Sequence, residues 1–134
     1  MKDKAIVRKI KAGPFLEWRG LYENYALWQI HGFDYIPIEQ IHSYRLNEEG
    51  LIEVFGGVLD LNLKEWSEIT DRFLKKLEDQ RDKIIKVLKE QKTEHGHDHD
   101  KNFCLRFFRD ENGKPDLKRM PRLYLIDFDQ AVSP

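Results

Sequence analysis

The sequence lacks the features that would tie it to an oxidising compartment or to a membrane. Cys104 is its only cysteine, which excludes an internal disulfide and favours a reducing compartment. No apolar run approaches the ~20 residues needed to cross a bilayer, and the start, Met-Lys-Asp-Lys, has no apolar region of the kind that secretion signals carry. These absences predict a protein without a transmembrane segment that is located in the cytoplasm.

An excess of charge of either sign is also missing. The 23 basic residues stand against 24 acidic ones, which is typical of an ordinary globular surface and argues against nucleic acid as a partner. Two local basic clusters, at 2–19 and at 114–122, leave open an anion site or a solvated surface. At 134 residues the chain is predicted to form one domain.

Periodicity and turn residues predict an α+β fold with antiparallel strands. Strands are expected at 5–11, 35–46, 51–55, 103–109 and 122–128, and helices at 15–31 and 63–91. Gly50 suits the left-handed position of a hairpin turn, and Gly32 suits the C-cap of the first helix. Asn62, three residues before Glu65, is a candidate cap for the second helix.

Two short motifs carry the chemistry. The stretch His-Gly-His-Asp-His-Asp-Lys-Asn-Phe at 95–103 ends with Asn102, and Leu-Ile-Asp-Phe-Asp at 125–129 contains Asp127. We expect the strand after Asn102 and the strand before Asp127 to pair as a hairpin, which would bring these two residues together. Asp129 would point the same way as Asp127 in an extended segment and could add a second carboxylate.

Together these motifs resemble the active-site loops of a kinase, and the resemblance extends over nearly the whole chain. Ala5–Phe15 looks like the third strand of a kinase N-lobe, with Glu17-Trp18-Arg19 extending the match, and Glu23–Ile30 resembles helix C. The Asp-Phe-Asp at 127–129 is similar to that of the lipopolysaccharide kinases, which phosphorylate Kdo or heptose sugars.

The resemblance implies a reduced protein-kinase-like fold. Residues 1–55 would form a small antiparallel N-lobe sheet with helix C, and residues 56–134 a hinge at Gly56-Gly57 and a minimal C-lobe with the catalytic hairpin. The implied function is ATP-dependent phosphorylation of a sugar hydroxyl, with ATP and Mg²⁺ as cofactors. For such a substrate, a peripheral position at the inner membrane is an additional expectation.

The resemblance also assigns residues to the nucleotide. Lys9 would contact the α and β phosphates and be held by Glu23. If the strand is shifted by one residue, Arg8 would face the cleft in its place. Glu53 and Phe55, on the strand that leads to the hinge, complete this predicted set.

The resemblance also implies metal and base positions in the two motifs. Asn102, Asp127 and Asp129 would be the Mg²⁺ ligands. His97 stands where the pattern His-Gly-Asp-x-x-x-x-Asn has its aspartate, so His97 and Asp98 are the two candidate bases.

Two other classes of function stay open. The chain has His97 at the base position and no glycine-rich loop before its first strand. Both features favour a weak pseudokinase that acts as a nucleotide- or partner-binding module. Such a module could also form a homodimer. Alternatively, the alternating His95, His97 and His99 could chelate Zn²⁺ or Ni²⁺.

Overall fold

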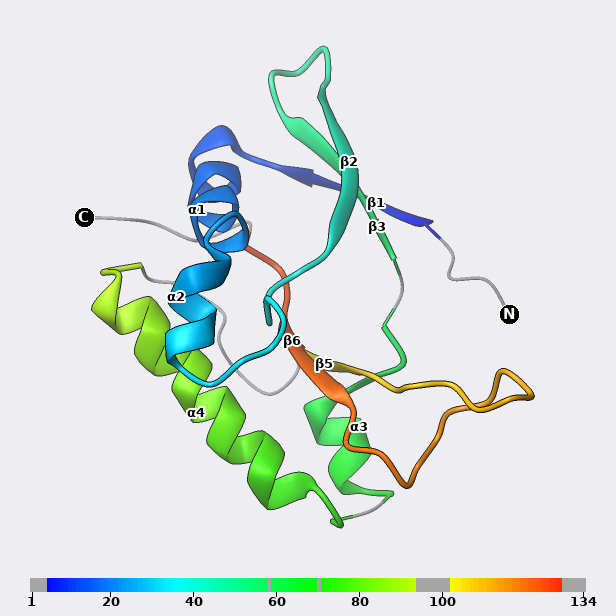
Figure 1. Cartoon of the computed structure of the whole chain (residues 1–134). Helices are drawn as coiled ribbons and strands as arrows, with labels where there is room; N and C mark the ends of the chain where they lie inside the picture. The colour runs from blue at the N-terminus through cyan, green and yellow to red at the C-terminus, as the bar shows by residue number, and fades with distance from the viewer. Residues whose placement is uncertain (1–4, 58, 70, 94–101, 129–134) are drawn as a thin grey trace.

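The computed structural model of the chain describes residues 5–57, 59–69, 71–93 and 102–128. Within these ranges, six strands and four helices form a mixed α+β fold with two antiparallel three-stranded sheets (Figure 1). The predicted α+β class is confirmed. None of the described helices is long and apolar enough to cross a membrane.

The first sheet is built from the N-terminal part of the chain. Its strands are β1 (Ala5–Ile10), β2 (Ile41–Leu46) and β3 (Ile52–Gly57), in the order β1-β3-β2. Gly50 has a φ of 80° in the turn between β2 and β3, a value that glycine adopts without steric cost, so the predicted turn is confirmed. The second strand is shorter than predicted, because the chain before Ile41 runs to the other sheet.

The second sheet is built from the C-terminal part. It contains β4 (Leu61–Asn62), β5 (Phe103–Arg106) and β6 (Arg122–Leu125), in the order β4-β5-β6. Phe103 lies opposite Leu125 in antiparallel register. The hairpin that was expected between the two motifs is therefore confirmed.

The prediction of one helix over 15–31 is wrong. The structure has α1 (Ala12–Tyr22) and α2 (Tyr25–Ile30), and the chain breaks between them at Asn24. The Asn24 side chain accepts a hydrogen bond from the backbone N–H of Leu27 at 3.2 Å and so begins a new helix. At the far end Gly32 has a φ of 93°, which confirms its predicted role in ending this helical region.

The single helix predicted over 63–91 is also wrong. The chain forms α3 (Leu63–Ser67) and α4 (Leu74–Glu90), although no glycine or proline separates them. The last turn of α3 tightens, because the N–H of Ile69 donates to the carbonyl of Trp66, three residues back. The predicted cap is confirmed, since Asn62 Oδ1 accepts a hydrogen bond from the N–H of Glu65 at 2.8 Å.

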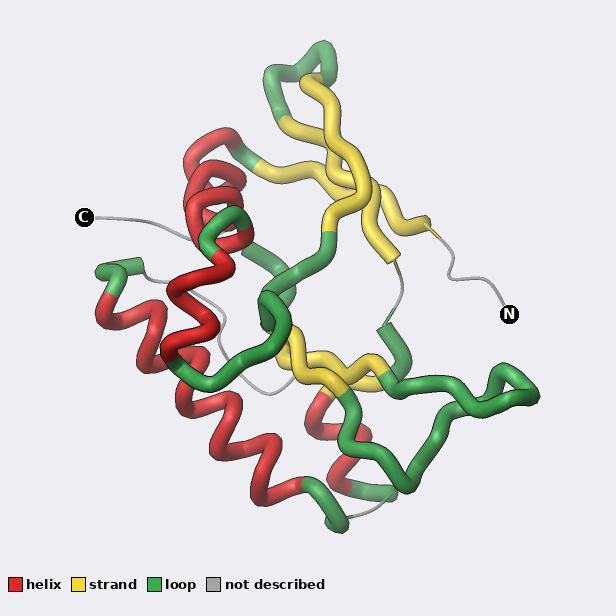
Figure 2. Tube along the Cα trace, in the orientation of Figure 1, coloured by secondary structure: helices red, strands yellow, loops and turns green. Residues whose placement is uncertain are grey.

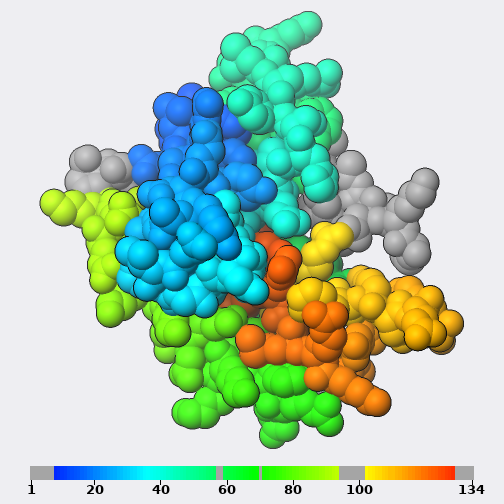
Figure 3. Space-filling view, in the orientation of Figure 1, coloured from blue at the N-terminus to red at the C-terminus, as the bar shows by residue number. Residues whose placement is uncertain are grey.

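The hydrophobic core lies where the helices meet the second sheet. Trp28, Leu77, Ile84 and Leu105 are fully buried in it. On the face seen in Figure 3, the blue surface of α1 and α2 adjoins the green surface of α4 and the orange-to-red C-terminal segment. Helices from both halves of the sequence therefore share one core.

The segment that precedes β2 ties the two sheets together (Figure 2). Ile38 forms a parallel bridge with Leu125 on β6. The N–H of Glu39 donates to the carbonyl of Leu125 at 2.7 Å, and the N–H of Leu125 donates to the carbonyl of Pro37 at 2.9 Å. This link brings Glu39 next to the end of β6, where the second motif begins.

Candidate functional site

A cavity of about 300 Å³ lies between the two sheets. Its walls come from β1, β3, β4, β5 and α3, together with the segments before β2 and before β4 and the residue after β6. Among the residues that line it, the charged ones are Arg8, Glu39, Asp60, Glu65 and Arg106. The cavity therefore combines apolar strand residues with charges of both signs.

Glu39 links several segments around this cavity. Arg8 donates to it through both terminal nitrogens, Nη1 to Oε1 at 2.6 Å and Nη2 to Oε2 at 2.9 Å. The backbone N–H of Asp127 donates to the same Oε1 at 3.0 Å. Glu39 is only 8% exposed, so this carboxylate is buried with its charge matched by a guanidinium.

The backbone of Glu39 is held as firmly as its side chain. Its N–H donates to the carbonyl of Leu125, and its own carbonyl accepts a hydrogen bond from Trp18 Nε1 at 2.8 Å. Helix α1 and strand β6 thus fix the position from which the carboxylate meets Arg8. Glu39 was not among the predicted site residues. Its position directly after the apolar Ile36-Pro37-Ile38 is a signal in the sequence, because an acid in such a segment is apt to be buried, and a buried carboxylate requires a partner.

Asp127 has an unusual backbone conformation. Its φ is 67°, in the left-handed region that residues other than glycine rarely adopt. Such a conformation costs about 1–3 kcal/mol and persists only where the surroundings enforce it. Here the N–H bond to Glu39 on one side and the fully buried Phe128 on the other fix the turn after β6.

The hairpin brings Asn102 and Asp127 together through the backbone. The N–H of Ile126, the neighbour of Asp127, donates to the carbonyl of Asn102 at 2.9 Å. Ile126 lines the cavity between the sheets, and both predicted metal ligands lie beside that lining rather than within it. A shared Mg²⁺ between their side chains stays a prediction.

The predicted pair between Lys9 and Glu23 is wrong. Lys9 Nζ binds Glu49 at 3.0 Å on the outer face of the first sheet, and Glu23 binds Arg19 one helical turn away at 2.5 Å. Successive side chains of a strand point to opposite faces, so Arg8 faces the cavity when Lys9 faces outward. Of the two alternatives, the structure places Arg8 in the cavity.

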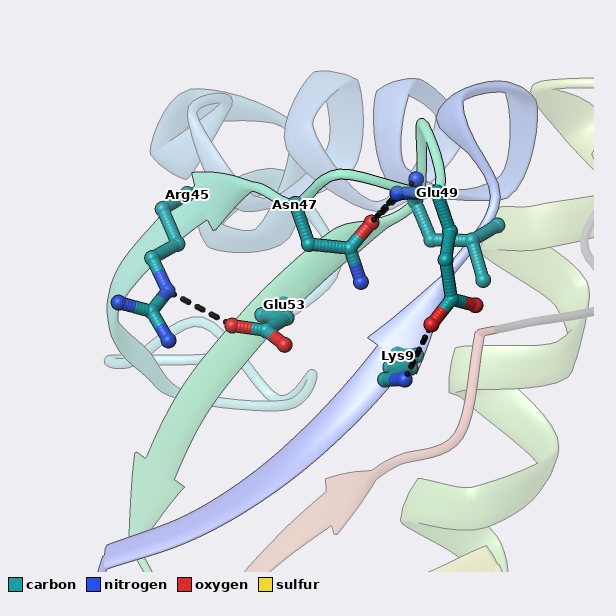
Figure 4. Close-up of polar contacts among 6 residues, drawn as sticks. Lys9, Arg45, Asn47, Glu49 and Glu53 are labelled. Atoms are coloured by element: carbon teal, nitrogen blue, oxygen red, sulfur yellow. Dashed lines mark hydrogen bonds and ion pairs between the residues drawn. The ribbon is translucent and has the colours of Figure 1, made fainter.

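Glu53 and Phe55 share the outer face with Lys9 and do not line the cavity of Glu39, so their predicted place in a nucleotide site stays a prediction. Figure 4 shows Glu53 directed toward Arg45 and Lys9 directed toward Glu49. Arg45 Nε donates to Glu53 Oε1 at 2.7 Å, which lowers the pKa of Glu53, and the Arg45 guanidinium lies 5.6 Å from the centre of the Phe55 ring.

The residues of β3 that line the cavity are Val54 and Gly56, which alternate with Glu53 and Phe55. Both glycines of the predicted hinge, Gly56 and Gly57, belong to β3, and the hinge itself stays a prediction. A Cβ atom on Gly56 would lie 2.8 Å from the carbonyl oxygen of Gln40, so glycine permits this close approach of two backbones.

Two further acids of the cavity, Asp60 and Glu65, lie close to polar groups of the protein. Asp60 accepts hydrogen bonds from the N–H of Phe107 at 2.9 Å and from Arg109. Glu65 lies near the thiol of Cys104. Burial, and then the carboxylates of Glu65 and Glu39, raise the pKa of Cys104 to about 12. The thiol therefore stays protonated and is not a nucleophile at neutral pH.

The second basic cluster packs against aromatic rings. The guanidinium of Arg119 lies 3.8 Å from the centre of the Phe108 ring, and that of Arg122 lies 5.0 Å from the centre of the Tyr35 ring. Two of the four basic residues of this cluster therefore have a role in packing that needs no bound anion. Lys114 and Lys118 lie on the same loop.

Several predicted residues lie outside the described part of the chain. They are the candidate bases His97 and Asp98, the third metal candidate Asp129, and the histidines at 95 and 99. Within the described ranges, no group of three or more His, Cys, Asp or Glu residues is arranged to hold a metal ion.

Comparison with known proteins identifies no relative of this chain. No protein-family model and no curated protein match the sequence. The residues of the site must therefore support any functional assignment on their own.

Proposed function

We propose that this chain binds a magnesium nucleotide at the cavity between its two sheets and transfers a phosphoryl group to a sugar hydroxyl. One observation supports this most directly. A single carboxylate, Glu39, joins Arg8 of the first sheet to the backbone of Asp127 after β6. Glu39 thus holds a cation that suits phosphate close to the backbone of the predicted metal ligand, and phosphoryl transfer needs both groups near the phosphates.

The cavity fits part of a nucleotide. Its volume of about 300 Å³ is at the small end of the range for ligand pockets. Val54, Leu61 and Ile126 offer apolar contact to a flat base, and Arg8 offers a fork of donors on the side toward Asp127. Because Glu39 holds both terminal nitrogens of Arg8, this guanidinium contributes orientation more than net positive charge.

Most of the positive charge that neutralises the phosphates must then come from the metal ion. Bound Mg²⁺ would neutralise charge on the phosphate oxygens and hold them in line for transfer. Asn102 and Asp127 would supply its amide and carboxylate ligands. Asp127 suits this role because its backbone is fixed in the left-handed conformation.

The acceptor and the base rest on the sequence. A sugar hydroxyl is proposed from the resemblance to Kdo and heptose kinases, and the protein-kinase-like arrangement of two lobes is proposed on the same ground. His97 or Asp98 would accept the hydroxyl proton. A neutral histidine is suited to that near pH 7.

Nucleotide binding with little or no transfer is the second candidate. It is favoured by His97 in the position of an aspartate and by the Glu39 carboxylate that offsets the charge of Arg8. Weakening a general base typically costs ~10²–10⁴ in rate, which leaves binding unaffected.

Calorimetry with Mg-ATP tests the proposal. We compare the natural sequence with Asp127→Asn, which removes the charge and keeps a residue that tolerates a positive φ. Binding that falls at least about tenfold in this variant supports the site. Undetectable binding by the natural protein, or equal affinity in the variant, contradicts it.

A phosphate-transfer assay then separates the two candidates. The protein is incubated with Mg-ATP and with Kdo or a heptose, and the phosphorylated sugar is measured by mass spectrometry. Product formation supports the kinase, whereas binding without product supports the nucleotide-binding module. Glu49→Gln serves as the control, because Glu49 pairs with Lys9 on the outer face.

A further inference from the structure

A second hollow lies at the end of the molecule formed by α3, the start of α4 and the loop that leads into β6. Its volume is about 350 Å³. Figure 1 shows α3 beside the orange segment before β6. The hollow shares no lining residue with the cavity of Glu39, so what it binds is independent of the nucleotide proposal.

The walls of this hollow are predominantly apolar. Trp66, Phe73 and Phe107 contribute aromatic rings from α3, from the residue before α4 and from the chain after β5. Ile69 and Leu117 also line it and are 64% and 56% exposed. Two large aliphatic side chains left in water on either side of an aromatic hollow favour a ligand that covers them.

Trp66 is the most buried of the aromatic residues that line the hollow. The residue is 1% exposed, and its Nε1 has no hydrogen-bond acceptor within the described part of the chain. The other two indoles differ, because Trp18 Nε1 donates to the carbonyl of Glu39 and Trp28 Nε1 donates to that of Leu21. Buried indole N–H groups usually have an acceptor, and in the described part of the chain this one does not. Because Nε1 is itself buried, Trp66 gives the hollow apolar surface, and its N–H is a reporter of changes in the packing around that wall.

The charge of the hollow has one sign. Arg72 and Lys118 line it from opposite segments, and none of its described lining residues is acidic. Arg72 also interacts within the protein, whereas Lys118 is on the exposed loop. Two cations that line an apolar hollow favour a ligand with an anionic group, such as a carboxylate.

We propose that this hollow binds a small molecule in which an apolar ring or branched chain is joined to a carboxylate. The apolar part would lie between the aromatic rings and the two exposed aliphatic side chains. The carboxylate would lie toward Lys118 and Arg72. A volume of about 350 Å³ accommodates such a molecule.

Nuclear magnetic resonance of the full chain tests this directly, because each indole N–H gives its own signal. The three tryptophans provide one reporter, Trp66, and two internal controls, Trp18 and Trp28. The Trp66 signal is assigned from its disappearance in Trp66→Phe. The probes are 3-phenylpropionate and 4-methylpentanoate, each compared with its uncharged amide.

A saturable shift of the Trp66 signal is expected with at least one carboxylate, with little change at the other two indoles. The matching amide should bind about tenfold more weakly, since it lacks the charge. The proposal fails if neither carboxylate gives a saturable shift, if all three indoles shift alike, or if acid and amide bind equally.

Two variants on one loop separate the site from general surface charge. Lys118→Gln should weaken binding of the carboxylate about tenfold. Lys114→Gln removes the same charge four residues away, at a position that does not line the hollow, and should leave binding unchanged. Equal loss in both variants would overturn the proposal and indicate a diffuse electrostatic effect.

Discussion

Arg8 and Glu39 form a two-hydrogen-bond ion pair across 31 residues of sequence, with donor–acceptor distances of 2.6 and 2.9 Å. The pair joins strand β1 to the segment that runs beside β6. The same carboxylate accepts the backbone N–H of Asp127, which is 88 residues away. One buried acid therefore links the first sheet to the turn in which the predicted metal ligand lies.

Glu39→Gln should destabilise the protein by about 1–3 kcal/mol, because a partly buried guanidinium–carboxylate pair becomes a weaker contact with a neutral partner. The Arg8 side chain is 31% exposed, so water compensates part of the loss and the full cost of an isolated buried charge is not reached. Urea unfolding measures the difference. The control is Glu49→Gln, whose exposed pair with Lys9 should contribute less than about 0.5 kcal/mol. Equal effects in both variants would mean that the Glu39 pair is not a structural link.

The left-handed backbone of Asp127 can be tested with two truncations. Asp127→Ala and Asp127→Gly both remove the carboxylate, but only glycine adopts a φ of 67° without strain. The glycine variant should therefore be more stable than the alanine variant by about 0.5–1 kcal/mol, although glycine usually lowers stability elsewhere. Thermal or urea unfolding decides this. A more stable alanine variant would show that the left-handed turn is not formed.

Gly56→Ala should be destabilising by about 1–3 kcal/mol. Its Cβ would meet the backbone carbonyl of Gln40 at 2.8 Å, and backbone cannot move aside as a flexible side chain can. Gly20→Ala is the matched control, because no atom lies within 4 Å of a Cβ there and the position is on α1. The control should stabilise the helix by up to about 1 kcal/mol. Effects of the same sign in both variants would contradict the close approach of β3 to the backbone of Gln40.

Cys104 should react slowly with iodoacetamide at pH 8. Its pKa is raised from 9.0 to about 12, chiefly by burial, so the thiolate fraction falls about a thousandfold relative to an ordinary cysteine. Mass spectrometry follows labelling of this single site, with the protein in 8 M urea as the reference. Labelling at a similar rate in the folded and unfolded protein would contradict the burial of the thiol.

The same shift gives a pH dependence of stability with a definite sign. A raised pKa in the folded state means that the contribution of Cys104 is fully present below about pH 9 and is lost as the pH rises toward 12. Cys104→Ser should reduce this alkaline loss of stability, since serine does not ionise in that range. An unchanged alkaline profile would show that other groups dominate it.

Much of the local structure could be predicted from the sequence. Gly50 and Gly32 adopt the positive φ values expected from their places after polar or helical residues, and Asn62 caps α3 as its spacing to Glu65 indicates. The β5–β6 hairpin was expected as well. These features depend on residues close together in the chain, or on strands whose patterns are strong by themselves.

The sequence did not decide between structures that its local patterns fit equally well. Helical periodicity favoured one helix over 63–91, but the chain ends α3 after Ser67 and begins α4 at Leu74. On β1 the sequence left Arg8 and Lys9 open, and a shift of one residue exchanges the two faces of a strand. The register with β3, which pairs Arg8 with Val54, settled that choice.

The sequence by itself determined the α+β class, the turns and the hairpin that brings Asn102 near Asp127, because each depends on the local preferences of consecutive residues. Only the tertiary structure decided that Arg8 faces the cavity and that Glu39 is its partner. The reason is that a buried charge is stable only where distant segments bring it a matching group, and 31 and 88 residues separate the groups that meet at Glu39.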